Sequence, residues 1–523
     1  MRGRALSALA AALLALTAGT AAAQEQPRRG GTLIYSVTGE PETYDCHASV
    51  SVAVMHRVAP HYSLLLQVDP NDYPRLKPDL ARAWTVSDDR LTYRFTLRDD
   101  VRFHDGTSLT SADVAASFER IRNPPEGVVS ARRAALADVQ AIETPDALTV
   151  VFRLARPNAA FLLILANPWN CIYSAQRLAA DPRFPARNII GTGPFRFVEH
   201  AAGSHWVGQR YDGYFEAGRP YLDGFRAVNV AGPALVNAIA GGQTLIDFRG
   251  LAPAERDRVR ATRGERTRFL EGPQSAAILL TFNTRRAPFD DARVRRALSI
   301  ALDRWTGAEM VGRLTLFGYV GGFLPPGQTG SRSADELAAL PGFERDMTRA
   351  RAEARRLLAE AGVTNLAFTF KNRPIYSPLG VFLLDQWRQI GVTVTHEQPE
   401  NAAFFAARRD GNFDVVVDAM SEFVDEPAVL WGQFLSRDRA PANISGAIDR
   451  TLDGLYDRLV GSFDPAGRAA LARDFEARLL TEAYTVPVFW VRRIIPVAAE
   501  LQGFVLTPSY LIGQNLADLW LRN

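Results

Sequence analysis

A strand, a turn and a capped helix follow one another between residues 78 and 122, and this block constrains the fold more than any other stretch. From Leu91 to Arg98, apolar and polar residues alternate, which is typical of a strand with one buried face. Asp105–Gly106 then indicates a turn, because glycine tolerates positive φ angles. Thr110 precedes Asp113 by three residues, which predicts a capped helix running through Phe118. The block contains no catalytic motif.

The chain begins with a pattern typical of an export signal. Arg2 and Arg4 precede an apolar run from Ala5 to Ala18, and Ala21–Ala23 follows directly before Gln24. This predicts a secretory signal peptide over residues 1–23, which is too short to anchor the chain in a bilayer. No cysteine follows the cleavage point. We therefore expect a soluble protein of the periplasm that is not a lipoprotein.

Two cysteines, Cys46 and Cys171, remain in the exported chain. An even number of cysteines in an oxidising compartment favours a disulfide, which would tie the N-terminal segment to a later part of the same lobe. The alternative is a pair of buried free thiols, because proximity in space does not follow from the sequence.

The second half of the chain has an alternating α/β pattern, and 523 residues are too many for one compact core. A helix beginning near Thr348 and ending at Gly362 precedes the predicted strand Leu366–Phe370. A second helix, ending at Gly391, precedes the predicted strand Val392–Val394. This βαβ rhythm predicts a sheet in a second lobe. Further predicted elements are a helix within residues 285–304 capped near Asp290 and strands at residues 30–37, 147–154 and 413–417. Residues 486–490 are expected to begin the return to the first lobe.

Composition and motifs exclude several classes of function. A formal charge of +3 gives no electrostatic footprint for nucleic acid. The chain lacks the G-x-S-x-G, H-E-x-x-H and C-x-x-C motifs, and its seven histidines show no metal-ligand spacing. His104 and Asp105 lie at the predicted turn, where a structural role is expected. We therefore predict that the protein is not an enzyme and that it uses no metal and no cofactor.

Four motif clusters resemble the extracytoplasmic solute-binding proteins of the peptide/nickel ABC-importer family. They are the opening Gly30–Leu33, the block at 78–122, Gly191–Phe197 and the segment from Phe282 to Arg304. The resemblance extends from Gly30 to about Trp490. It implies a large two-lobed α/β periplasmic-binding-protein fold with an extra subdomain in lobe I and a ligand cleft between the lobes. It also implies a monomer that delivers a peptide or similar small solute to an ABC permease and ATPase complex in the inner membrane.

The resemblance divides the chain into consecutive regions that alternate between the lobes. We expect a signal peptide at 1–23, the start of lobe I at 24–61, its inserted subdomain at 62–185, its continuation at 186–275, lobe II at 276–490 and a return to lobe I at 491–523.

The same resemblance implies an anchor for the ligand's carboxylate. Relatives that bind dipeptides use an arginine in a segment similar to Asn372–Pro378, which points to Arg373. Guanidinium groups form strong paired hydrogen bonds with carboxylates. The alternative is a surface arginine in a loop.

The residue that binds the ligand's amine in those relatives is acidic, but Phe423 stands at its position here. Asp418, Glu422 or Asp425 could replace it. This departure leaves a longer peptide or an organic anion as open as a dipeptide.

Other candidates for lining the cleft are Tyr44, His47, Phe423, Trp431 and Trp490, with Asn283 as a polar contact. Tyr44 and His47 are in a loop near the expected rim of the cleft. Receptors for opines, organic anions, metal chelates or haem, and a signalling or chaperone-like module on the same fold, remain alternative functions.

Overall fold

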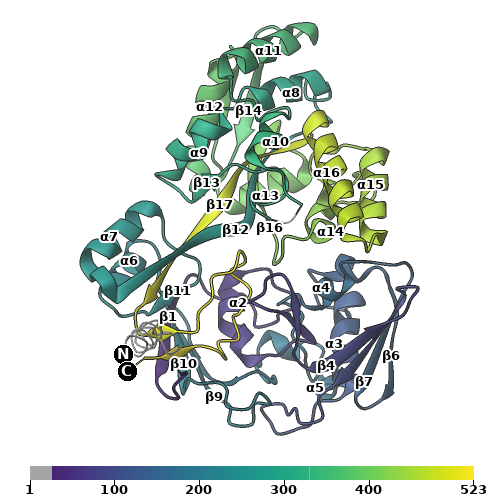
Figure 1. Cartoon of the computed structure of the whole chain (residues 1–523), viewed down its shortest axis with the longest axis vertical. Helices are drawn as coiled ribbons and strands as arrows, with labels where there is room; N and C mark the ends of the chain where they lie inside the picture. Colours follow the sequence, from purple (N-terminus) through teal and green to yellow (C-terminus); the bar gives the residue numbers. More distant parts are fainter. Residues whose placement is uncertain (1–25, 329, 523) are drawn as a thin grey trace, which may run out of the picture.

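The computed structural model describes residues 26–328 and 330–522. The predicted signal peptide lies outside these residues. Figure 1 shows two lobes stacked along the long axis, with β1 and β10 in the lower one. We call the lower part lobe I, which contains β1 to β11, and the upper part lobe II, which contains β13 to β16 and α8 to α16. The predicted two-lobed α/β architecture is confirmed.

One 11-stranded mixed sheet runs through both lobes. Strand β13 (Phe317–Tyr319) pairs with β17 beside the main path. The other strands follow one another across the sheet in this order: β15 (Thr393–Glu397), β14 (Ala367–Lys371), β16 (Val415–Ser421), β12 (Thr267–Phe282), β17 (Thr485–Ala498), β11 (Ile246–Asp247), β1 (Thr32–Val37), β10 (Gly224–Asn229), β9 (His205–Arg210) and β8 (Phe195–Ala201).

The two long antiparallel strands β12 and β17 connect the lobes, as Figure 1 shows. From the sequence, residues 486–490 are expected only to begin the return to lobe I, whereas the structure has a strand there that continues to Ala498 and is buried along nearly its whole length. Pairing between the two strands is interrupted between Pro273 and Ala277. Within this gap, the Ser275 N–H donates to the Pro508 carbonyl at 2.8 Å. The sheet is therefore continuous but irregular where the lobes meet.

The block at residues 78–122 forms part of a separate four-stranded antiparallel sheet in lobe I. The predicted strand is β5 (Thr92–Leu97), whose residues Tyr93, Phe95 and Leu97 are buried. The predicted helix is α3 (Ser111–Arg122), and the Thr110 N–H donates to the Asp113 carboxylate at 2.7 Å, as a capping box requires. The remaining strands of this sheet are β4 (Ala81–Val86), β6 (Val139–Asp146) and β7 (Thr149–Leu154).

The helices that pack on the lobe II part of the sheet form the main hydrophobic core of that lobe. The helix predicted within residues 285–304 is α8 (Ala292–Ile300), but its cap is Asp291 rather than Asp290, since the Asp291 carboxylate accepts the Arg293 N–H at 2.7 Å. The other helices of lobe II are α9 (Arg304–Gly312), α10 (Ala334–Ala338), α11 (Met347–Glu360), α12 (Ser377–Arg388), α13 (Asn401–Asp410), α14 (Pro427–Leu430), α15 (Arg450–Gly461) and α16 (Pro465–Glu482).

Lobe I carries shorter helices and two small hairpins. Its remaining helices are α2 (Val52–Val58), α4 (Phe161–Leu165), α5 (Ala175–Ala180), α6 (Pro233–Ala240) and α7 (Pro253–Arg263). The hairpins pair β2 (Leu66–Val68) with β3 (Leu76–Pro78), and β18 (Leu501–Gln502) with β19 (Trp520–Leu521).

Candidate ligand-binding site between the lobes

Arg373 lies just beyond the carboxyl end of β14, beside Asp418 of β16. The parallel register of these strands brings the two residues together, because Phe370 pairs with Val415 and Lys371 with Val416. Ligands of open α/β sheets bind outside the carboxyl ends of parallel strands. The position of Arg373 is therefore one at which a ligand group is expected.

Two guanidinium groups share one carboxylate at this point. Arg373 Nη2 donates to Asp418 Oδ1 at 2.9 Å and to the Tyr376 hydroxyl at 2.7 Å. Arg408, on α13, also forms an ion pair with Asp418. Among the described residues, Nη1 of Arg373 has no hydrogen-bond partner. The cluster therefore keeps one uncompensated positive charge and free donors for an anion.

The loop that follows β16 reaches from lobe II into lobe I. Phe423 and Val424 are buried in the same apolar cluster as Leu165 and Ile172 of lobe I. The Tyr73 hydroxyl of lobe I donates to Asp425 Oδ2 at 3.0 Å. A cavity of about 280 Å³ lies beside this loop, between side chains of both lobes that include Pro74, Leu163, Gln328, Asp425 and Arg468. Phe423 is therefore a contact between the lobes.

Of the three acids considered as replacements for the missing amine anchor, Glu422 is the one without a side-chain partner among the described residues, although Oδ1 of Asp425 also lacks a hydrogen-bond partner there. Asp418 is bound by Arg373 and Arg408, and Asp425 by Tyr73. Within the described part of the chain, no side chain donates a hydrogen bond to the Glu422 carboxylate. Burial raises the pKa of Glu422 to about 7, although the positive charge of Arg132 opposes this. A cationic ligand group would restore its charged form.

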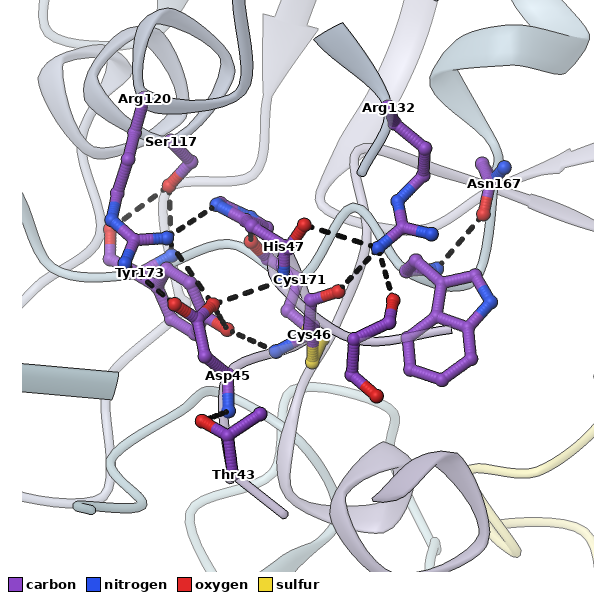
Figure 2. Close-up of a disulfide and its surroundings, with 12 residues drawn as sticks. Thr43, Asp45, Cys46, His47, Ser117, Arg120, Arg132, Asn167, Cys171 and Tyr173 are labelled. Atoms are coloured by element: carbon purple, nitrogen blue, oxygen red, sulfur yellow. Dashed lines mark hydrogen bonds and ion pairs between the residues drawn. A yellow bond between two sulfur atoms is a disulfide. The ribbon is translucent and has the colours of Figure 1, made fainter. Parts of the chain in front are cut away.

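The Cys46–Cys171 disulfide is confirmed, with its two Cα atoms 6.1 Å apart. Figure 2 shows that it lies within a dense polar cluster. Arg120 pairs with the buried carboxylate of Asp45 at 2.6 Å, and the Tyr173 hydroxyl donates to the same carboxylate at 3.1 Å. This part of lobe I is therefore cross-linked by covalent and ionic contacts.

His47 belongs to this cluster and is fully buried. Its Nε2 donates to the Cys171 carbonyl at 2.9 Å, and its Nδ1 accepts from Arg120 at 3.1 Å. Burial lowers the pKa of His47 to about 3, so the ring is neutral at pH 7. Both ring nitrogens are occupied by protein partners, which gives His47 a structural role in place of the predicted position at the cleft rim.

The other residues predicted to line the cleft also have structural contacts and do not lie with Arg373. The Tyr44 hydroxyl bonds to His200 Nδ1 at 2.8 Å, and its ring packs on Trp206. The Asn283 amide donates to the carbonyls of Gly411 and Phe413, 3.0 and 2.9 Å away.

Trp431 and Trp490 share one buried cluster of lobe II. Their indole N–H groups donate to the Phe323 and Gly322 carbonyls. These two tryptophans, like Tyr44 and Asn283, stabilise the lobes rather than the candidate site.

Arg132 is a cation of the disulfide cluster in lobe I that no sequence motif indicated (Figure 2). Its Nη2 donates to the carbonyls of Cys46, His47 and Ser49 at 2.7, 3.2 and 2.5 Å (Figure 2). Its guanidinium lies 5.0 Å from the ring centre of Trp169. These partners come from two segments that are distant from Arg132 in the sequence, residues 46–49 and Trp169, so only the folded chain brings them together. The sequence around Arg132 carries no motif that would have identified it.

The described residues offer neither a metal site nor a membrane span. In residues 26–328 and 330–522, no three side chains of the metal-ligating types gather closely enough to hold an ion. No helix within these ranges is sufficiently long and apolar to cross a bilayer. The candidate site is therefore described by its charged and aromatic side chains alone.

Comparison with known proteins agrees with the geometry. Residues 75–441 match the family model described as bacterial extracellular solute-binding proteins, family 5 middle. The chain is 26% identical over 489 residues to the probable D,D-dipeptide-binding periplasmic protein DdpA of Escherichia coli K12, a match that covers 91% of this chain and 92% of that protein.

Two solved structures have the same fold over nearly the whole chain. The PBP AgaA of A. tumefaciens R10, in complex with agropinic acid, is 25% identical with a TM-score of 0.78, covering 94% of this chain and 99% of AgaA. DppA of Helicobacter pylori, in complex with the peptide STSA, is 20% identical with a TM-score of 0.81, covering 95% and 99%. The chain therefore belongs to family 5 of the bacterial extracellular solute-binding proteins, which are the substrate-binding components of ABC transporters and not enzymes.

Proposed function

We propose that this protein captures a small solute with a carboxylate at one end and an amine at the other, such as a short peptide or an opine-like amino acid derivative. Arg373 binds the carboxylate through its free Nη1, and Glu422 binds the amine. The observation that carries this proposal is that both groups stand beside β16 with hydrogen-bonding capacity that the protein leaves unused.

The spacing of the two anchors favours a solute longer than a dipeptide. A strand rises about 3.3 Å per residue, so the four-residue step from Asp418 to Glu422 spans about 13 Å. An extended peptide covers about 3.3–3.6 Å per residue. A tripeptide therefore fits between the anchors once the side chains reach inward.

The proposed mode of action is closure of the two lobes on the solute, followed by delivery to an ABC permease and ATPase in the inner membrane. The names of relatives such as DdpA place them in the periplasm, and we propose the same location and a monomeric state here. We propose lobe I for 24–61, 62–185 (the inserted subdomain), 186–275 and 491–523, and lobe II for 276–490. The interrupted pairing between Pro273 and Ala277 supports a hinge near 275.

Isothermal titration with trialanine, N-acetyl-trialanine and trialanine amide tests the two anchors separately. We expect trialanine to bind, and blocking either end to weaken binding. Arg373→Ala should reduce the affinity for trialanine by about 1.5–3 kcal/mol, the usual contribution of a charged hydrogen bond. The Arg409→Ala variant is the matched control, because Arg409 is an exposed arginine that pairs only with Asp410 among the described residues. Equal binding of all three peptides would contradict the proposal.

A further inference from the structure

The cavity of about 280 Å³ beside the loop that follows β16 does not include the proposed solute anchors, since neither Arg373 nor Glu422 lines it. Pro74 and Leu163 of its lining belong to lobe I, and its other lining residues belong to lobe II. In Figure 1 this is where α4 of lobe I lies opposite α14 of lobe II. Pro74 and Pro465 are exposed, so the cavity can be reached from solvent. A molecule bound there would contact both lobes.

The walls of this cavity are mostly apolar. Aliphatic side chains and prolines provide most of the lining, among them Leu163, Leu324, Val424, Pro427, Leu459 and Ala469. An apolar cavity of about 150 Å³ is sufficient to hold benzene. The larger volume here therefore has room for an aromatic ring with a short side arm.

Two acceptors in the lining of this cavity have no donor. Asp425 is only 4% exposed, and its Oδ2 accepts from the Tyr73 hydroxyl at 3.0 Å. Its Oδ1 has no hydrogen-bond partner among the described residues. Gln328 donates through Nε2 to the Asp425 carbonyl at 2.5 Å, and its Oε1 also lacks a partner among those residues. A buried acceptor without a donor costs about 1–3 kcal/mol, so a ligand with N–H groups would be stabilised here.

The charged side chains that line the cavity carry one excess negative charge. Glu426 forms an ion pair with Arg468, whereas Asp425 has no cationic partner among the described lining residues. Burial raises the pKa of Asp425 to about 6, although the hydroxyls of Tyr73 and Ser275 oppose this shift, so the carboxylate is charged at pH 8. A buried charge is costly unless it is paired. The lining therefore lacks a single positive charge.

We propose that this cavity is a second binding site, which takes a small organic molecule with one primary ammonium group and an apolar body. The ammonium binds Asp425 and Gln328, and the body packs against the apolar walls. An ammonium group has three N–H donors and no acceptor, so it satisfies both free oxygens. A calcium ion takes about six to eight oxygen ligands, which these two side chains do not supply. The site is independent of the proposed function, because it uses neither Arg373 nor Glu422.

Isothermal titration at pH 8 with phenethylamine and its uncharged analogue 2-phenylethanol tests this site. We expect phenethylamine to bind at least about tenfold more tightly, the effect of one charged hydrogen bond. Asp425→Asn should abolish this preference, because an amide NH₂ in the place of Oδ1 repels an ammonium and donates to an alcohol. Ala469→Phe should weaken the binding of both probes, because the larger side chain fills the cavity.

Asp474→Asn is the matched control, since Asp474 is an exposed acid on α16, the helix that carries Arg468, and it should keep the preference. Melting temperatures show whether each variant is folded. If Asp425→Asn does not fold, Ala469→Phe decides, and unchanged binding of both probes to it would overturn the site.

Three further outcomes contradict the second site. They are equal affinity of the two probes for the unaltered protein, failure of both probes to bind it, and an undiminished preference in Asp425→Asn. Loss of phenethylamine binding in Glu422→Gln, with binding retained in Asp425→Asn, would place the amine at the proposed solute anchor and would also overturn the site. The titration with trialanine tests the proposed function separately, so either proposal can fail while the other stands.

Discussion

Arg132 in lobe I and Arg373 in lobe II show two ways in which this protein holds a cationic side chain. Arg132 is held by three main-chain carbonyls next to a disulfide. Arg373 is held by the Asp418 carboxylate, which also binds Arg408. The first arrangement positions a charge without neutralising it, while the second neutralises part of the charge and leaves the group open to solvent.

This difference shows which interactions stabilise each arrangement. The lobe I cluster depends on chain connectivity and buried contacts, because the side chains of Arg120 and Asp45 are only 3 and 4% exposed. The lobe II cluster depends on charge pairs that water and salt can reach, since the Arg408 side chain is 28% exposed. Perturbations of the covalent framework should therefore affect lobe I more, and ionic strength should affect lobe II more.

Removing the disulfide should give the largest effect. The Cys46→Ala/Cys171→Ala double variant frees a loop with a sequence separation of 125 residues, and the loss of unfolding free energy expected for such a loop is about 4 kcal/mol. Urea unfolding of the variant and the oxidised parent measures it. The dithiothreitol-reduced parent is the control and should match the variant. A loss below about 1 kcal/mol would mean that the ionic contacts alone hold this cluster together.

Acid should act on the two regions with opposite sign. Burial raises the folded-state pKa of Asp425 to about 6, so the native state takes up a proton first and gains stability as the pH falls from 7.5 to 5. Burial lowers the pKa of His47 to about 3, so the unfolded state takes up the proton first and the native state loses stability over the same range. Each contribution should be about 1–2 kcal/mol.

The Asp425→Asn and His47→Gln variants separate these two contributions. Relative to the parent, Asp425→Asn should become less stable as the pH falls, and His47→Gln should become more stable. Urea unfolding of the three proteins at pH 5 and 7.5 provides the measurement. Parallel pH profiles for all three proteins would show that neither group titrates as its burial implies.

Asp418→Asn should give the smallest effect, a loss of about 1 kcal/mol, because its ion pairs are partly open to solvent and Arg373 keeps its bond to Tyr376. The loss should shrink in 1 M NaCl, which screens the charges. Asp410→Asn is the control, since the exposed pair of Asp410 with Arg409 should contribute nothing measurable. A loss above about 3 kcal/mol that persists in high salt would place Asp418 among the fully buried ion pairs and remove the contrast with lobe I.

Local patterns predicted local structure well. The strand β5, the capping box at Thr110 and the helix α8 were all predicted, because each depends on residues only a few positions apart. Strand β17 was not predicted, because a strand buried on both faces lacks the alternation that marks a half-buried one.

The candidate site was predicted less completely. Arg373 was singled out through its family-like segment, and its ligand-binding role stays a prediction. Tyr44, His47, Asn283, Trp431 and Trp490 instead pack within the lobes. An aromatic or polar residue near an expected rim has the same local signature whether its side chain turns outward or inward. That choice depends on partners that are distant in the sequence.

The sequence by itself determined the family and the α/β rhythm, and it favoured a disulfide between Cys46 and Cys171, which the structure confirmed. Short-range periodicity, motif order and residue chemistry suffice for these. Only the tertiary structure decided that Glu422 has no side-chain partner among the described residues, that Phe423 is a contact between the lobes and that Arg132 stands beside the disulfide. These features depend on contacts between segments more than 80 residues apart in the sequence. No local sequence pattern indicates which carbonyl or ring a side chain will contact there.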